Sequence, residues 1–92
     1  MPEPSRATLP ALLVESARRD PAQVAVEDPP DAAVTYGALD ALSDRVRDRL
    51  VRLGVRRGDR VGVYLAKSID AVAGIFGAMK AGAAYVPVDA AA

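Results

Sequence analysis

Residues 79–89 read MKAGAAYVPVD and predict a helix end, a turn and a strand. Gly82 is placed to end the helix, because glycine adopts the left-handed conformation found after many helices at no steric cost. Ala84 to Val88 predict a short strand. Pro87 puts that strand at a sheet edge or at an irregular strand end, because proline donates no hydrogen bond to a neighbouring strand. Local physical chemistry therefore accounts for this segment without any assumed function.

The helix that leads into this segment is predicted to begin at Ser68 as its cap. Its charged residues, Asp70 and Lys80, lie at the ends where the helix dipole favours each sign. Two interior glycines cost roughly 1 kcal/mol each relative to alanine. We expect close packing to offset that cost, against a sheet and further protein. The interior residues are large (Ile69, Val72, Ile75, Phe76, Met79) or small (Ala71, Ala73, Gly74, Gly77, Ala78, Ala81).

A strand is predicted immediately before this helix, over residues 60–65. Val61, Val63 and Leu65 alternate with Gly62 and Tyr64, which is the period of an extended chain. A strand, a helix and a second strand form one βαβ unit, and the two strands of such a unit are expected to be parallel.

The first half of the chain predicts two more helices and a short strand at residues 24–27. Thr8 is expected to cap the first helix, which Asp20-Pro21 ends. A turn-rich loop follows at residues 28–31. Thr35 is expected to cap the second helix. Gly54 is expected to end it. The apolar stripe of that helix contains Leu39, Leu42, Val46, Leu50 and Leu53.

The second helix also carries a row of carboxylates, Asp40, Asp44 and Asp48, at a spacing that places them on one face. Such a row could bind a divalent metal. Arginines interleave with it, however, and the helix has the pattern of a surface helix, so we interpret the row as solvated. Asp48 and Arg52 have the order that favours an ion pair within a helix.

Composition excludes several classes of function. The 92 residues contain twelve basic and twelve acidic side chains, and no cysteine or histidine. Balanced charge argues against a nucleic-acid or anionic-membrane partner. Disulfides, thiol nucleophiles and imidazole bases are absent. Residues 66–68 lack the glycines of a phosphate-binding loop. No membrane span or signal peptide is visible, so we expect a cytoplasmic protein. Residues 1–7 are expected to be disordered.

Taken together, these segments resemble the N-terminal end of the adenylate-forming, or AMP-binding, enzyme superfamily. Residues 34–39, VTYGAL, resemble its first core motif, usually Thr-Tyr-x-Glu-Leu. Residues 79–89 resemble the second, usually Leu-Lys-Ala-Gly-x-Ala-Tyr-Val-Pro-hydrophobic-Asp-Pro. Residues 54–61 match the turn into a strand between them. The matching motif positions, whose roles we expect to be structural, are Thr35, Tyr36, Leu39, Lys80, Gly82, Tyr85, Pro87 and Asp89.

The sequence departs from the family pattern at two positions. Ala38 replaces the usual glutamate, so only half of a capping box can form. Ala90 replaces the usual proline. These 92 residues also lack features that lie further downstream in the family. They are the glycine-rich loop for ATP phosphates, the aspartate that contacts the ribose, the acid pocket and the lid with its lysine. We therefore assign no catalytic, cofactor-binding or metal-binding residue to this chain.

The resemblance implies an α/β fold, the N-terminal piece of the large subdomain of such an enzyme, with three helices, short strands, one βαβ unit and an incomplete sheet. It implies a reaction of a carboxylic acid with ATP and Mg²⁺ that gives an acyl-adenylate and pyrophosphate. The acyl group then passes to the thiol of CoA or of a carrier protein. The second motif is closest to amino-acid adenylation domains of nonribosomal peptide synthesis. By the same resemblance, Ala84 would contact an MbtH-like helper protein.

Three hypotheses remain open at this point. The chain is the N-terminal part of a longer ligase, with residues 1–92 forming a partial subdomain. Alternatively, it is one subunit of a split ligase, or a small non-enzymatic binding or scaffold protein. All three predict that the isolated chain releases no pyrophosphate from an acid and ATP.

Overall fold

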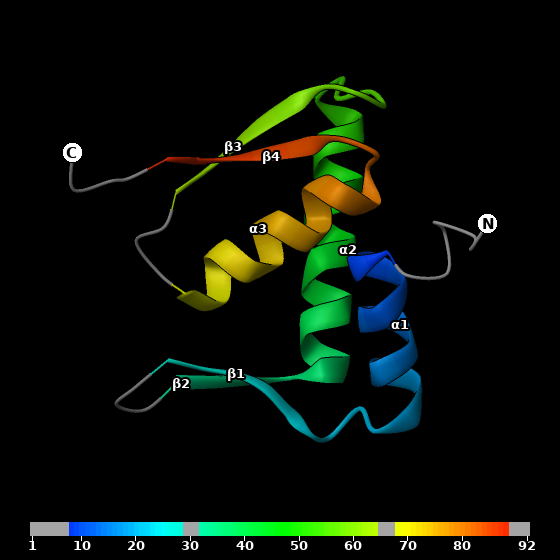
Figure 1. Cartoon of the computed structure of the whole chain (residues 1–92), viewed down its shortest axis with the longest axis vertical. Helices are drawn as coiled ribbons and strands as arrows, with labels where there is room; N and C mark the ends of the chain where they lie inside the picture. The colour runs from blue at the N-terminus through cyan, green and yellow to red at the C-terminus, as the bar shows by residue number, and fades with distance from the viewer. Residues whose placement is uncertain (1–7, 29–31, 65–67, 89–92) are drawn as a thin grey trace.

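The computed structural model describes residues 8–28, 32–64 and 68–88. The predictions for residues 1–7, for residues 29–31 of the turn-rich loop, for Leu65, for the loop at residues 66–67 and for Asp89 lie outside these ranges. The described helices are α1 (Leu9–Arg19), α2 (Tyr36–Arg52) and α3 (Ser68–Lys80). The described strands are β1 (Val24–Asp28), β2 (Ala32–Thr35), β3 (Arg60–Tyr64) and β4 (Ala84–Val88). Figure 1 shows α2 running through the length of the molecule, with α1 beside it and α3 crossing it.

The predicted βαβ unit is confirmed. Strands β3 and β4 are parallel and in register from Arg60 opposite Ala84 to Tyr64 opposite Val88. Helix α3 forms the crossover between them. Gly82 has a φ of 82°, the left-handed conformation expected where α3 ends.

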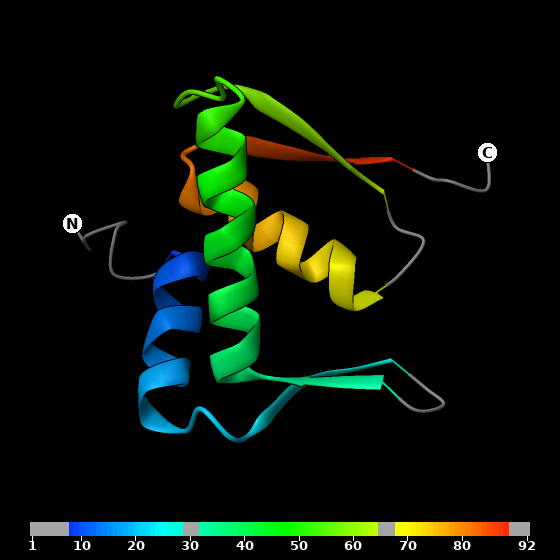
Figure 2. The same cartoon turned by 180° about the vertical axis from the view of Figure 1, so that it is seen from behind.

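Strand β2 was not expected from the sequence. It pairs antiparallel with β1, from Asp28 opposite Ala32 to Val24 opposite Thr35, with an irregularity between Val24 and Val26. Two alanines begin β2, and alanine has little intrinsic preference for strands. The pairing partner, rather than the local sequence, therefore determines this strand. The sheet β1–β2 and the sheet β3–β4 lie at opposite ends of α2 in both views (Figures 1 and 2).

The predicted caps of α1 and α2 are confirmed. The hydroxyl of Thr8 accepts a hydrogen bond from the Ala11 amide at 3.3 Å, and that of Thr35 accepts one from the Ala38 amide at 3.1 Å. Helix α2 ends at Arg52, and Gly54 follows with a φ of 97°. The prediction that Leu53 belongs to the apolar stripe was wrong. It is 71% exposed, because the chain leaves the helix there.

The core lies where the three helices meet. Leu13 of α1, Leu39 of α2 and Ala73 of α3 are buried and form one cluster. Half-buried apolar residues from β1, β2, α2 and α3 pack against the cluster. Val34 is one of them and packs against the cluster that contains Leu39, as expected of the two positions of a hydrophobic staple.

Helix α3 is packed closely, as its small residues predict. At Gly77, an added Cβ atom would lie 2.5 Å from a methyl carbon of Val46 and 3.1 Å from the carbonyl oxygen of Ser43. Real Cβ atoms do not approach other atoms so closely. Only glycine therefore fits at this point of contact between α3 and α2.

Candidate functional site

The first motif lies at the start of α2. Thr35 caps the helix, and the Tyr36 amide donates a hydrogen bond of 2.9 Å to the carbonyl of Gln23 at the end of the α1–β1 connection. Leu39 is 2% exposed and points into the core. The next amide, that of Gly37, donates to the carbonyl of Pro21 at 3.0 Å. This motif therefore joins the start of α2 to the segment before β1.

The second motif covers the end of α3, the turn and β4. The amide of Gly58 donates a hydrogen bond of 2.9 Å to the carbonyl of Gly82. The amide of Ala84 donates one of 2.8 Å to the carbonyl of Asp59. Both bonds join the turn after α3 to the turn before β3. Pro87 lies opposite Val63 in the parallel pair.

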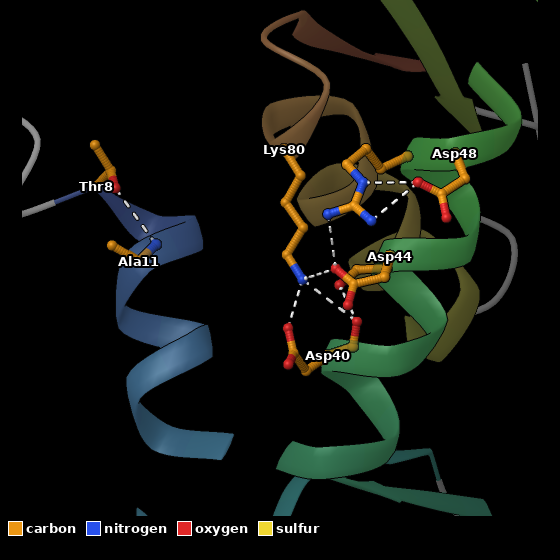
Figure 3. A network of polar contacts seen from close by, with 8 residues as sticks. Thr8, Ala11, Asp40, Asp44, Asp48 and Lys80 are labelled. Carbon is orange, nitrogen blue, oxygen red and sulfur yellow. Dashed lines mark hydrogen bonds and ion pairs between the residues drawn. The ribbon is translucent and has the colours of Figure 1, made fainter. Parts of the chain in front are cut away.

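Lys80 connects the two motifs. Its ammonium group lies against the carboxylate of Asp40, the residue that follows Leu39, and it lies 2.7 Å from a carboxylate oxygen of Asp44 (Figure 3). It also donates a hydrogen bond of 3.3 Å to the backbone carbonyl of Asp40. The Lys80 side chain is 7% exposed, whereas those of Asp40 and Asp44 are 25% and 40% exposed.

The interpretation of the aspartate row as solvated was therefore incomplete, since Asp44 is 40% exposed but Asp40 is only 25% exposed. Both carboxylates pair with a cation from another helix. Sequence spacing within α2 could not reveal this pair, because Lys80 lies 40 residues from Asp40. The sequence does contain one indication of this pair. The apolar helix α3 ends in a single lysine, which needs acceptors if it is buried.

Asp48, the third member of the row, remains at the surface. It is 58% exposed and pairs with Arg47 at 2.9 Å, not with Arg52 as expected. Arg47 also lies 3.3 Å from Asp44, so it extends the cluster toward solvent. The hydrogen bond to Asp48 raises the pKa of the Arg47 guanidinium, and the neighbouring carboxylates act in the same direction. The group stays charged at any physiological pH.

An open hollow of about 680 Å³ lies over this cluster, between α1, α2 and the end of α3. Thr8, Ala11 and Val14 line one side of it, and Met79, Lys80 and Ala83 line another. Its charged groups are already paired with one another, except that Arg57 at its margin forms no ion pair within the described residues. The residues described in the structure contain no cluster of side chains suited to a metal ion. The arrangement is therefore suited to holding the end of α3 against α2.

A second hollow, of about 270 Å³, is apolar. It lies between α1, β1 and α3. Leu12, Val26 and Phe76 are among its lining residues, together with Tyr36 of the first motif. No charged side chain lines it, so it offers shape and apolar area but no reactive group.

Strand β4 presents the exposed part of the second motif. Ala84 is exposed, Tyr85 is 41% exposed and Val86 is 42% exposed. Parallel sheets are normally covered on both faces. An exposed apolar strand in a parallel pair is therefore a surface on which further protein would pack.

Comparisons with known proteins agree with this description. A family described as "AMP-binding enzyme" matches residues 13–92. Syringomycin synthase SyrB1 of Pseudomonas syringae is 45% identical over 75 residues, which is 82% of this chain and 12% of that protein. Phosphinothricin tripeptide synthetase PhsC of Streptomyces viridochromogenes is 44% identical over 82 residues, which is 89% of this chain and 8% of that protein.

Solved structures give the same result. The nonribosomal peptide synthetase FmoA3, in a form with AMPPNP bound, has a TM-score of 0.85 at 37% identity, over 91% of this chain and 9% of that one. VinN has a TM-score of 0.86 at 30% identity, over 94% of this chain and 23% of that one.

The chain thus spans only a small part of the length of the relatives it matches, 12% and 8% for the two synthetases named above. Within the described ranges, no helix has the length and apolar character needed to cross a membrane. The family match covers both motifs, the βαβ unit and the helices α2 and α3. This chain belongs to the AMP-binding enzyme family, and it matches a segment of nonribosomal peptide synthetases.

Proposed function

We propose that residues 1–92 form a partial N-terminal subdomain of an ATP- and Mg²⁺-dependent ligase that adenylates an acid. The acid is an amino acid, and the acyl group passes from AMP to the thiol of a carrier protein or of CoA. The complete enzyme acts in the cytoplasm. The observation that carries this proposal is the family match over residues 13–92, with relatives that are peptide synthetases. A neighbour in a form with AMPPNP bound supports ATP as the nucleotide.

In this proposal, the chain supplies structure rather than chemistry. Activating a carboxylate with ATP requires groups that bind phosphates and stabilise the charge that develops during transfer. Lys80 and Arg47, the two cations of the carboxylate cluster, are engaged by carboxylates of α2. Neither is free to hold a phosphate. We therefore place the phosphate loop, the acid pocket and the lid lysine in polypeptide beyond this segment.

The experiment is an amino-acid-dependent exchange of pyrophosphate into ATP. The product of the complete reading frame that contains this segment is expected to catalyse exchange with one or a few amino acids. The 92-residue chain alone is expected to give no exchange. Exchange by the purified 92-residue chain would contradict the placement of the site. A complete product that exchanges with no amino or carboxylic acid would contradict the proposed activity.

The exchange assay also separates the split-ligase alternative from the others. A split ligase predicts exchange only when this chain is mixed with a second subunit that carries the phosphate loop. A non-enzymatic binding or scaffold protein predicts no exchange in any combination. The small share of the relatives that this chain spans favours the longer ligase over both.

We further propose that the start of β4 contacts an MbtH-like helper, with Ala84 at the contact. The exposure of Ala84, the first residue of the strand, supports this proposal. In co-purification with such a helper, Ala84→Glu is expected to reduce recovery of the complex several-fold. Ala33→Glu is the matched control, because Ala33 is an exposed strand alanine at the other end of α2. Equal recovery of the two variants would contradict the contact.

A further inference from the structure

Lys80 holds two helices together through a nearly buried charge. Within the described part of the chain, the acceptors of its ammonium group all lie on α2: the carboxylates of Asp40 and Asp44 and the backbone carbonyl of Asp40. Among the described residues, these are the ion pairs that join different elements, since both pairs of Arg47 stay within α2. Figure 3 shows the lysine reaching from the last turn of α3 to the side of α2.

The other described contacts of α3 differ in kind from the Lys80 ion pairs. Val72 and Phe76 pack against the core. Gly77 approaches Val46 and Ser43 closely. Apolar packing is not directional. Lys80, three residues beyond Gly77, adds a directional contact with α2 in the last turn of α3.

The position of Lys80 along the chain gives its contact with α2 a consequence. Two residues later, Gly82 turns the chain toward β4. The Gly82 carbonyl accepts from Gly58, and the Ala84 amide donates to Asp59, so the turn is tied to the start of β3. Fixing the end of α3 on α2 therefore also fixes where β4 begins.

Energetics favour a positioning role over a purely stabilising one. A buried ion pair gains little net free energy relative to apolar residues of the same volume, because both charges lose water. Removing one partner, however, leaves the other charge without its counterion. Fixing one arrangement of packed elements is the best-attested reason to keep such a pair.

We propose that Lys80 is a positioning residue: with Asp40 and Asp44, it locks the end of α3 onto α2 and thereby sets the position of the Gly82 turn and the start of β4. A lock of this kind acts locally. Its loss should increase the mobility of the turn more than that of the core around Leu13, Leu39 and Ala73.

The test is amide hydrogen exchange of the 92-residue chain, followed by NMR, without any assay of adenylation. In Lys80→Met, the Gly58 and Ala84 amides are expected to exchange at least about tenfold faster relative to core amides such as that of Ser43. Arg47→Met is the matched control, because it removes ion pairs that lie within α2, and it is expected to leave these ratios unchanged. A uniform increase at all amides of Lys80→Met would overturn the proposal.

A triple variant, Lys80→Met with Asp40→Asn and Asp44→Asn, separates the positioning role of Lys80 from the effect of unpaired charge. It also replaces Lys80→Met in the comparison with the wild-type chain if Lys80→Met does not fold. Neutralising the carboxylates removes the uncompensated charge. The triple variant is expected to recover protection of the core amides and to keep fast exchange at Gly58 and Ala84. Full recovery at both of these amides would overturn the positioning role. The proposal would also be overturned if the Gly58 and Ala84 amides of the wild-type chain exchanged as fast as unprotected amides.

Discussion

The two halves of the second motif differ in what surrounds them. The helical half, at the end of α3, is packed against α2, where Ala78 is fully buried and Lys80 is 7% exposed. The strand half, β4, pairs with β3 alone among the described strands and leaves Tyr85 and Val86 more than 40% exposed. The chain therefore buries the helical half of the motif by itself. The strand half leaves apolar side chains exposed, on which further protein would pack. This contrast fits a segment that scaffolds a larger enzyme.

The largest effect is expected in the packed region, at Leu39. Leu39→Ala removes a side chain that is 2% exposed in the core on which α3 packs. Such a cavity lowers the free energy of unfolding by about 2–5 kcal/mol. Urea denaturation of the 92-residue chain measures it. Leu53→Ala is the matched control just beyond the end of the same helix, and at 71% exposure it should change stability by less than about 0.5 kcal/mol. Similar losses in both variants would show that the core is not where we place it.

The next effect is expected at the contact of α3 with α2. Gly77→Ala puts a methyl group 2.5 Å from a Val46 methyl carbon, and overpacking of this kind costs about 1–3 kcal/mol. Better helix propensity offsets about 1 kcal/mol of that loss. A net loss should appear in thermal or urea unfolding, and Val46→Ala in the same chain should relieve it in part.

Gly74→Ala is the control for this contact, because its added Cβ would lie 3.3 Å from Val63, a separation that a small shift can accommodate. It should be clearly milder than Gly77→Ala. If Gly77→Ala stabilised the chain instead, α3 would not pack on α2 as closely as described.

A smaller effect is expected at the helix cap of the first motif. Thr35→Ala removes the oxygen that accepts from the Ala38 amide and should cost about 1 kcal/mol. Thr35→Ser keeps that oxygen and should retain most of the stability. Both are measured by urea denaturation. An equal loss in the two variants would assign the effect to the lost methyl group rather than to the cap.

The smallest effect is expected on β4. Val86→Ser changes a side chain that is 42% exposed and should alter the free energy of unfolding of the 92-residue chain by about 0.5 kcal/mol or less. Val63→Ser, on the paired strand, buries a hydroxyl at a position that is 7% exposed and should cost about 1–3 kcal/mol. A large loss at Val86 would mean that the chain already covers this strand.

Local signals in the sequence predicted much of the fold. Thr8 and Thr35 cap helices, Gly54 and Gly82 end them, and the small residues of α3 predicted its burial. Each of these signals acts within a few residues of the feature that it predicts. The parallel β3–β4 pair followed from the order of strand, helix and strand.

Features that depend on distant residues were not predicted. Strand β2 forms because β1 lies beside it, and its Ala-Ala start carries little preference of its own. The pairing of Lys80 with Asp40 and Asp44 depends on how α3 crosses α2, and spacing along one helix contains no information about that. The exposure of Leu53 depends on where α2 ends, and helix ends are the least certain feature of a sequence pattern.

Carbene footprinting read by mass spectrometry compares the packed and the exposed regions in one experiment. In the 92-residue chain, Tyr85 and Val86 are expected to be labelled strongly and Leu39 weakly. In the complete ligase, labelling of Tyr85 and Val86 should fall several-fold, while that of Leu39 stays low. Unchanged labelling of Tyr85 and Val86 in the complete ligase would contradict the account, because β4 would then not be a surface on which the rest of the enzyme packs.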